Sequence, residues 1–149
     1  MSGATGGLPH SVQVRLVRHA KALAMDPNHV LTRFATERFL YRLSRSGHAE
    51  RFVLKGALLL LVWLGEAIRP TRDADLLGFG DLSPKAVAET FAEICALDVE
   101  PDGLTFDSSS IRVAAIRRED AYGGSGSRSR RGSAARACAS RSMSAPATP

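Results

Sequence analysis

The sequence changes character abruptly near residue 121, and this change limits which residues can form a core. Residues 121–149 contain no Leu, Ile, Val, Phe or Trp, and consist largely of Ser, Ala, Arg and Gly. Such a segment buries too little apolar surface to offset the entropy of ordering its backbone, about 1–2 kcal/mol per residue. We therefore expect a single domain at residues 8–122, a disordered Gly-rich start at 1–7 and a disordered tail at 123–149.

Two other hypotheses for the tail stay open. The chain has 20 Lys and Arg against 15 Asp and Glu, and subtracting the five arginines of residues 121–149 leaves 15 against 15. An acid-free basic tail is also typical of an arm that binds RNA or DNA. Alternatively, the tail is translated out of frame from a GC-rich gene. One choice of codons for residues 142–149, shifted by two bases, reads Asp-Val-Gly-Ala-Gly-Asp-Ala, and sequencing the gene tests this hypothesis.

Several classes of protein are excluded by composition and spacing. The longest apolar run, residues 57–64, is well short of the roughly 18–20 residues that cross a bilayer, and the start of the chain has no signal-peptide pattern. We therefore expect a cytoplasmic protein without membrane contact. Cys95 and Cys138 lack metal-site spacing and are expected to be free thiols, and none of the four histidines lies in a metal-binding motif.

The hydrophobic spacing predicts an α+β or α/β domain. Helices are expected at residues 8–24, 30–45, 57–64 and from 84 onward, and strands at 52–54, 73–79, 104–106 and 111–116. Asp26 or Asn28 is expected to cap the second helix, and Ser83 to cap the helix that begins at Pro84. Trp63 and the leucines around it are expected in the core.

One stretch combines several features of a nucleotide site. On a strand, Asp73 and Asp75 would share one face, about 6–7 Å apart along the backbone. Paired carboxylates suit Mg²⁺, which binds one or two carboxylates together with substrate phosphates. Gly56 opens a helix directly after a strand, where free backbone N–H groups can receive a phosphate. Cationic side chains are close in sequence, at Lys55, Arg69 and Arg72.

Each part alone has a simpler structural explanation. A D-x-D pair is more often a solvated turn, and Lys-Gly after a strand is usually only a turn. Arg72 beside Asp73 can form a surface ion pair worth about 0–1 kcal/mol. The order of the parts, namely a strand, a glycine, a helix and then two acids entering an apolar strand, favours the nucleotide site.

In this order, FVLKGA at residues 52–57 and RPTRDADL at 69–76 resemble the first motif of the AbiEii/AbiGii toxin family. Its members are nucleotidyltransferases of the DNA polymerase β superfamily, and the resemblance covers about residues 8–122. It implies a minimal nucleotidyltransferase core, a mixed sheet flanked by helices, that is incomplete at the C-terminus. Family members are toxins of toxin–antitoxin or abortive-infection systems, paired with a separate antitoxin, and some transfer nucleotides from an NTP to tRNA 3′ ends.

The resemblance also assigns residues. It implies that Asp73 and Asp75 are the catalytic, Mg²⁺-binding acids, and that the NTP is bound by Lys55, Gly56, Ala57 and Arg72. Two departures stand out: Ala57 replaces the usual Gly or Ser, and the spacer to Asp73 is longer than in the shortest family pattern.

A third carboxylate, which the superfamily carries on a later strand, is missing from any apolar strand. Asp107, after Leu104 and Phe106, is the best remnant among the later acids (Asp98, Asp102, Asp107, Glu119 and Asp120). The out-of-frame reading would supply the missing acidic strand. We therefore expect a truncated, defective form of an enzyme that transfers NMP from an NTP to a hydroxyl acceptor, with tRNA or another RNA as the acceptor. The alternative is a non-catalytic module that pairs with an antitoxin or RNA.

Overall fold

Helices and short antiparallel strands make up the parts of the chain that the computed structural model describes, which are residues 8–65 and 73–115, and residues 135–139 as backbone. In chain order the elements are α1 (Leu8–Ala22), α2 (Pro27–Arg45), the 3₁₀ helix η1 (Ala49–Arg51), β1 (Phe52–Lys55), α3 (Ala57–Leu64), β2 (Asp75–Gly78), α4 (Pro84–Ala96), the 3₁₀ helix η2 (Ser108–Ser110), β3 (Ile111–Ala115) and β4 (Ala135–Ala139). This confirms the predicted α+β class.

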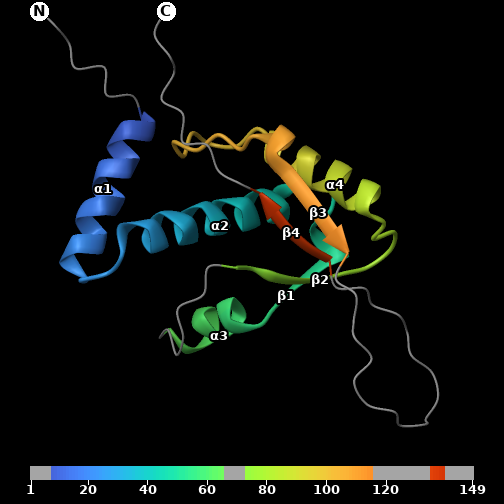
Figure 1. Ribbon diagram of the computed structural model, residues 1–149, viewed down its shortest axis with the longest axis horizontal. Coiled ribbons are helices and arrows are strands. Elements are labelled where there is room, and N and C mark those ends of the chain that lie inside the picture. Colours follow the sequence, from blue (N-terminus) through green and yellow to red (C-terminus); the bar gives the residue numbers. More distant parts are fainter. Residues whose placement is uncertain (1–7, 66–72, 116–134, 140–149) are drawn as a thin grey trace, which may run out of the picture.

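The strands form two ladders, and both are antiparallel. β1 pairs with β2, and β3 pairs with β4. In the first ladder Phe52 lies opposite Gly78 and Lys55 lies opposite Asp75. Figure 1 shows α3 at the far end of β1, on the opposite side of the view from α4. The chain therefore leaves β1 for α3 and returns to the same ladder as β2.

The core lies where α2 and α4 meet the inner face of β1. Ala35 and Leu43 of α2 are buried there together with Val87, Phe91 and Ile94 of α4. Aromatic rings join the elements: Phe91 stacks on Phe39 with centroids 5.1 Å apart and meets Phe52 edge-on at 5.9 Å. Burial of these side chains is the main force that holds β1 against the helices.

Local capping chemistry fixes the helix ends as predicted. Asp26 caps α2 by accepting a hydrogen bond from the Asn28 backbone N–H at 2.9 Å, and Ser83 accepts one from Ala86 at 3.4 Å. α3 ends at Gly65, whose φ of 68° lies in the left-handed region that glycine adopts readily.

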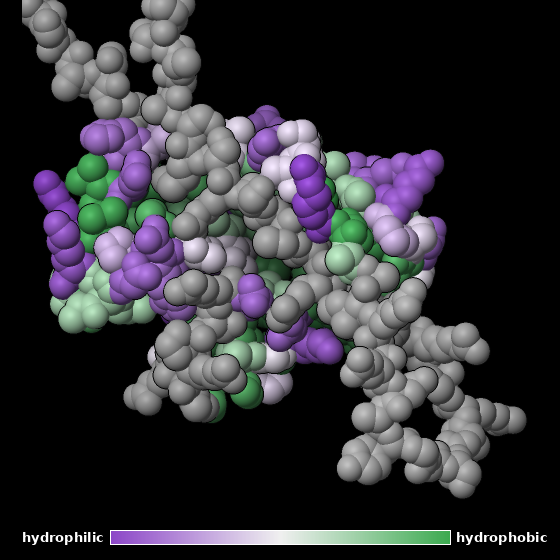
Figure 2. Space-filling view, viewed as in Figure 1, coloured by the Kyte–Doolittle hydropathy of each residue, from purple (hydrophilic) through white to green (hydrophobic). Residues whose placement is uncertain are grey.

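The prediction that Trp63 lies in the core is wrong. Its side chain is 73% exposed, and Val62 and Leu64 beside it are 68% and 57% exposed, whereas Leu58 is buried. Apolar surface is visible at the position of α3 in Figure 2. Because α3 is apolar on every side, its sequence carries no signal for which face packs, and in the structure only the face around Leu58 is covered.

Other boundaries also differ from the expectations. β2 begins at Asp75, two residues later than expected, and residues 104–106 are not a strand. Residues 135–139 form β4 within the tail that was expected to be disordered throughout. Residues 1–7, 123–134 and 140–149 lie outside the described residues. No helix in the described part of the chain combines the length and hydropathy that a membrane span requires.

Candidate functional site

The β1–β2 ladder presents Lys55 and Asp75 side by side on its outer face. Exposure alternates along β1: Val53 and Lys55 are exposed, while Phe52 and Leu54 face inward. Asp75 is exposed and lies directly opposite Lys55. Residues opposed in an antiparallel pair share a face, with Cβ atoms about 4.5–5.5 Å apart. The ladder therefore places Lys55 and Asp75 opposite each other, on one face, where β1 ends.

Gly56 makes room for that carboxylate. Its backbone has φ 75° and ψ −157°, a region open essentially to glycine alone. A Cβ built on Gly56 would lie 2.5 Å from Oδ2 of Asp75, a distance that requires the neighbour to shift. The Asp75 carboxylate thus lies directly against the start of α3. We call Lys55, Gly56, Ala57 and Asp75 the β1–α3 corner.

The N-terminus of α3 adds positive potential to the corner. Gly56 is the N-cap and supplies no side-chain hydrogen bond, while its carbonyl accepts the first helical bond from the Leu60 N–H at 3.2 Å. The N–H groups of the first turn, from Ala57 onward, have no partner within the helix. A helix start of this kind attracts anionic groups such as phosphate.

The predicted site residues are brought together in part. The structure gathers Lys55, Gly56 and Asp75, and places Ala57 at the first helical position. Asp73 is exposed and precedes β2 by two residues, in a non-helical segment. Arg72 lies outside the described residues. Within residues 8–65 and 73–115, no three His, Cys, Asp or Glu side chains are grouped as a metal site.

The opposite end of the ladder is tied to the rest of the fold by Arg51. Its carbonyl accepts a hydrogen bond from the Phe79 N–H at 2.8 Å, and its guanidinium donates to the Asp81 carbonyl at 3.1 Å and to the Thr90 hydroxyl at 3.4 Å. These bonds fix the register of β1 and β2. A slip of one residue would turn Asp75 to the inner face.

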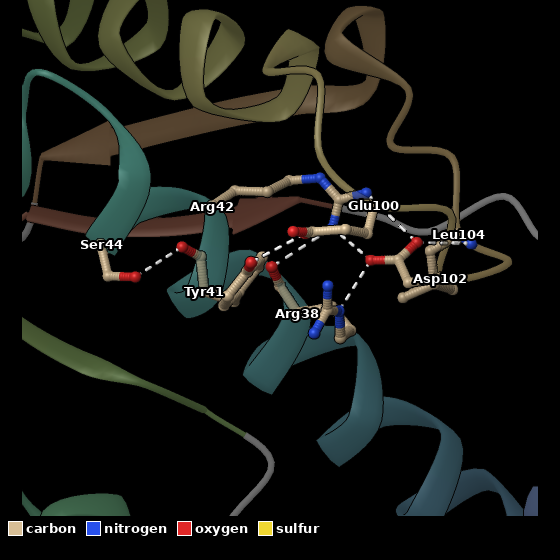
Figure 3. A network of polar contacts seen from close by, with 7 residues as sticks. All are labelled: Arg38, Tyr41, Arg42, Ser44, Glu100, Asp102 and Leu104. Carbon is tan, nitrogen blue, oxygen red and sulfur yellow. Dashed lines mark hydrogen bonds and ion pairs between the residues drawn. The ribbon is translucent and has the colours of Figure 1, made fainter.

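A buried ionic network was not predicted from the sequence (Figure 3). The Asp102 carboxylate accepts hydrogen bonds from Arg42 Nη1 and Arg38 Nε, both at 2.7 Å, and from the Leu104 N–H at 3.0 Å. The side chains of Arg42 and Asp102 are only 6% and 8% exposed. Nearby, the Tyr41 hydroxyl donates to Glu100 at 2.8 Å. The network fastens α2 to the loop between α4 and β3.

Two opposing effects set the pKa of Asp102. Burial raises this pKa, but the hydrogen bonds from Arg42 and Arg38 outweigh burial and lower it to about 2. Asp102 is therefore ionised at neutral pH and holds two arginines in place. The spacing of Arg38 and Arg42 puts them on one face of α2, but their partner lies far along the chain in an irregular loop, where no sequence signal marks it.

Asp107, the expected remnant of a third catalytic acid, caps a 3₁₀ helix. It is the N-cap of η2, and its carboxylate accepts hydrogen bonds from the Ser109 hydroxyl at 2.6 Å and the Ser109 backbone N–H at 2.9 Å. These bonds lower the pKa of Asp107. The carboxylate satisfies donors of its own turn, and the strand expected before it is absent from residues 104–106.

Comparison with known proteins identifies the family. The family model described as "Nucleotidyl transferase AbiEii toxin, Type IV TA system" matches residues 38–135, which include the whole β1–α3 corner and most of the chain. No curated protein and no solved structure matches the chain. The chain therefore belongs to the AbiEii family of nucleotidyl transferase toxins, the toxins of type IV toxin–antitoxin systems.

Proposed function

We propose that the β1–α3 corner binds an NTP and that the protein transfers NMP from it to a hydroxyl acceptor on RNA, with tRNA as the acceptor. The observation that carries this proposal is the position of the Asp75 carboxylate, which lies against Gly56 at the start of α3 and opposite Lys55. A carboxylate, an amine and a helix N-terminus together suit a phosphate group that arrives with a cation.

The residues present fit Mg²⁺. The space that a Cβ at Gly56 would fill is the space that admits the Asp75 carboxylate. Carboxylate oxygens are the ligands that Mg²⁺ takes in proteins, and Asp73 and Asp75 would hold it. When bound, this ion neutralises charge that develops on the transferring phosphate.

The protein's own groups have separate tasks in the proposed reaction. The first-turn N–H groups of α3 bind the triphosphate, and Lys55 and Arg72 offset its charge. The acceptor hydroxyl oxygen bonds to the α-phosphorus, the bond to the β-phosphate oxygen breaks, and pyrophosphate leaves with that electron pair. We propose that the hydroxyl proton passes to water and that transfer is slow, because among the described residues no third acid joins Asp73 and Asp75 in a metal-binding group.

An antitoxin is the proposed protein partner. The family description places these toxins in toxin–antitoxin systems, so a cognate antitoxin that restrains the toxin is the partner expected for this chain.

A labelled-NTP assay tests the transfer. The full chain is incubated with each α-³²P-labelled NTP and tRNA, with and without Mg²⁺, alongside Asp73→Ala and Asp75→Asn. Glu89→Gln is the matched control, because Glu89 is an exposed acid of α4. Mg²⁺-dependent incorporation that is lost in both Asp variants and retained in Glu89→Gln supports the proposal. Incorporation by Asp75→Asn at the full rate contradicts it.

Calorimetric titration with Mg²⁺ and ATP separates binding from transfer. Binding that Asp75→Asn abolishes, without incorporation by the unsubstituted chain, identifies a nucleotide-binding module that lacks transferase activity. Equal binding by the unsubstituted chain and Asp75→Asn contradicts the assignment of the corner.

A further inference from the structure

Charge in the N-terminal part of the chain is segregated. Residues 1–25 contain Arg15, Arg18 and Lys21 and no Asp or Glu. Residues 1–120 hold 15 cations and 15 acids, so residues 26–120 hold 12 cations against the same 15 acids. Residues 1–25 therefore carry a net formal charge of +3, all of it on α1, and residues 26–120 carry −3.

The structure presents these cations outward. Arg15, Arg18 and Lys21 are all exposed. At 3.6 residues per turn they fall within about 120° of the helix circumference. Hydrophilic side chains line the outer edge of α1 at the left of Figure 2. The ion pairs between described residues involve other cations. Lys21 lies in the last turn of α1, where a cation stabilises the helix through its dipole. Arg15 lies in the middle of α1, so the helix dipole does not explain a cation at this position.

The inner face of α1 is already occupied. Ala20 is fully buried, and α1 packs along α2. Near its start, Val12 and Pro9 lie so close to Gly103 that a Cβ there would meet them at 3.0 and 3.2 Å. A helix that binds a membrane surface inserts its apolar face into the lipid. Because this face of α1 packs on α2, the cations on the outer face point to a partner that is recognised by charge.

We infer that the outer face of α1, formed by Arg15, Arg18 and Lys21, binds the phosphate backbone of the acceptor RNA. This inference rests on the proposed transfer to RNA and adds the surface that holds the acceptor. α1 lies before the region matched by the family model, which begins at residue 38. The remainder of the domain is net negative, so an RNA that approaches it is drawn toward α1.

Salt-dependent binding of fluorescently labelled tRNA tests the inference. The assay omits NTP, so that it is independent of the β1–α3 corner. The test variant is Arg15→Gln/Arg18→Gln/Lys21→Gln, and the control Arg33→Gln/Lys85→Gln/Arg112→Gln removes the same charge elsewhere. Each phosphate contact adds about 0.7–0.9 to the slope of log K against log salt, so loss of three contacts lowers the slope by about 2–3.

Each outcome decides the question. A slope lowered by about 2–3 in the α1 variant, with less change in the control, supports the inference. Equal changes in the two triple variants overturn it, because binding then follows net charge alone. Unchanged tRNA binding with lost binding to phosphatidylserine vesicles also overturns it, in favour of a lipid surface. If circular dichroism shows that the α1 triple variant does not fold, the single variant Arg18→Gln is measured instead. It should lower the slope of log K against log salt by about 0.7–0.9.

Two further variants keep the explanations apart. Replacing the tail arginines 128, 130, 131, 136 and 141 by Gln should leave the effect of the α1 variant intact, and loss of all RNA binding through the tail alone overturns the inference. Asp75→Asn should bind tRNA with the unchanged slope. These measurements can therefore refute the proposed nucleotide site while supporting the RNA-binding surface, or refute the RNA-binding surface while supporting the nucleotide site.

Discussion

Replacing Gly56 by alanine tests the geometry of the β1–α3 corner most directly. Two consequences are expected from one methyl group. The backbone at φ 75° and ψ −157° is open essentially to glycine, and the new Cβ would lie 2.5 Å from the Asp75 carboxylate. The first consequence lowers stability, and the second displaces a group that we assign to the binding of Mg²⁺ and NTP.

The stability change can be estimated from the backbone. Strain in this region costs about 1–3 kcal/mol, and alanine recovers about 0.4–1 kcal/mol by restricting the unfolded chain. The contact with Asp75 adds less than the backbone strain, because Oδ2 can rotate away, while Cβ and Cγ, each 3.3 Å from the new Cβ, need to move only by a few tenths of an ångström. We expect Gly56→Ala to lower the free energy of unfolding by about 1–2 kcal/mol.

Two other glycines serve as matched controls. Gly65 has φ 68° but nothing within 4 Å of its ideal Cβ, so Gly65→Ala should show backbone strain alone. Left-handed alanine costs about 1–2 kcal/mol before the unfolded-state gain is subtracted. Gly47 has neither a positive φ nor a neighbour within 4 Å, and Gly47→Ala should be neutral or stabilising by up to about 1 kcal/mol.

Urea denaturation followed by circular dichroism measures stability, and calorimetric titration measures Mg²⁺–ATP binding. Gly56→Ala should weaken this binding as much as Asp75→Ala does, and the double variant should weaken it no further, whereas Gly65→Ala should leave it unchanged. If Gly56→Ala matched Gly47→Ala in stability and kept full binding, the close approach of Asp75 to Gly56 would be refuted.

Three further predictions concern the Asp102 network and the packing of α3. Because the pKa of Asp102 falls from 3.8 to about 2 on folding, stability that is present above pH 4 should be lost as the pH falls toward 2, by about 2 kcal/mol in acid titrations of unfolding, and Asp102→Asn should remove this dependence. Arg42→Met should cost about 3–5 kcal/mol in urea denaturation, because it leaves a buried carboxylate with a poorer set of donors. Trp63→Ser should change stability by less than about 0.5 kcal/mol, whereas Leu58→Ala should cost about 2–5 kcal/mol, and similar values for the two would contradict their exposures.

Features decided within a few residues could be predicted from the sequence. The caps at Asp26 and Ser83 and the presence of α2, α3 and α4 follow from short-range hydrogen bonding and helical spacing. The α+β class follows from the same patterns. The order of Lys55, Gly56 and the acids also indicated the corner, since a strand, a glycine and a helix fix most of its path.

Features decided by distant contacts could not be predicted. Trp63 was expected in the core because an apolar helix gives no sign of which side is covered. The ionic network of Asp102 has no sequence signal, because its partners on α2 are brought to it only by the packed fold. The sequence pattern relates Gly56 only to phosphate binding. Its close approach to the Asp75 carboxylate depends on the register between β1 and β2, which are separated in the sequence by α3.

The pairing of Lys55 with Asp75 has a consequence for how the sequence can vary. The chain leaves the ladder after Lys55 and rejoins it at Asp75, which lies opposite Lys55. The pairing of these two residues holds both ends of the connecting segment in place, whatever the length of that segment. Doubling the length of a flexible closed loop costs only about 0.6 kcal/mol. Because closure depends so weakly on length, the long spacer before Asp73 is compatible with an intact corner.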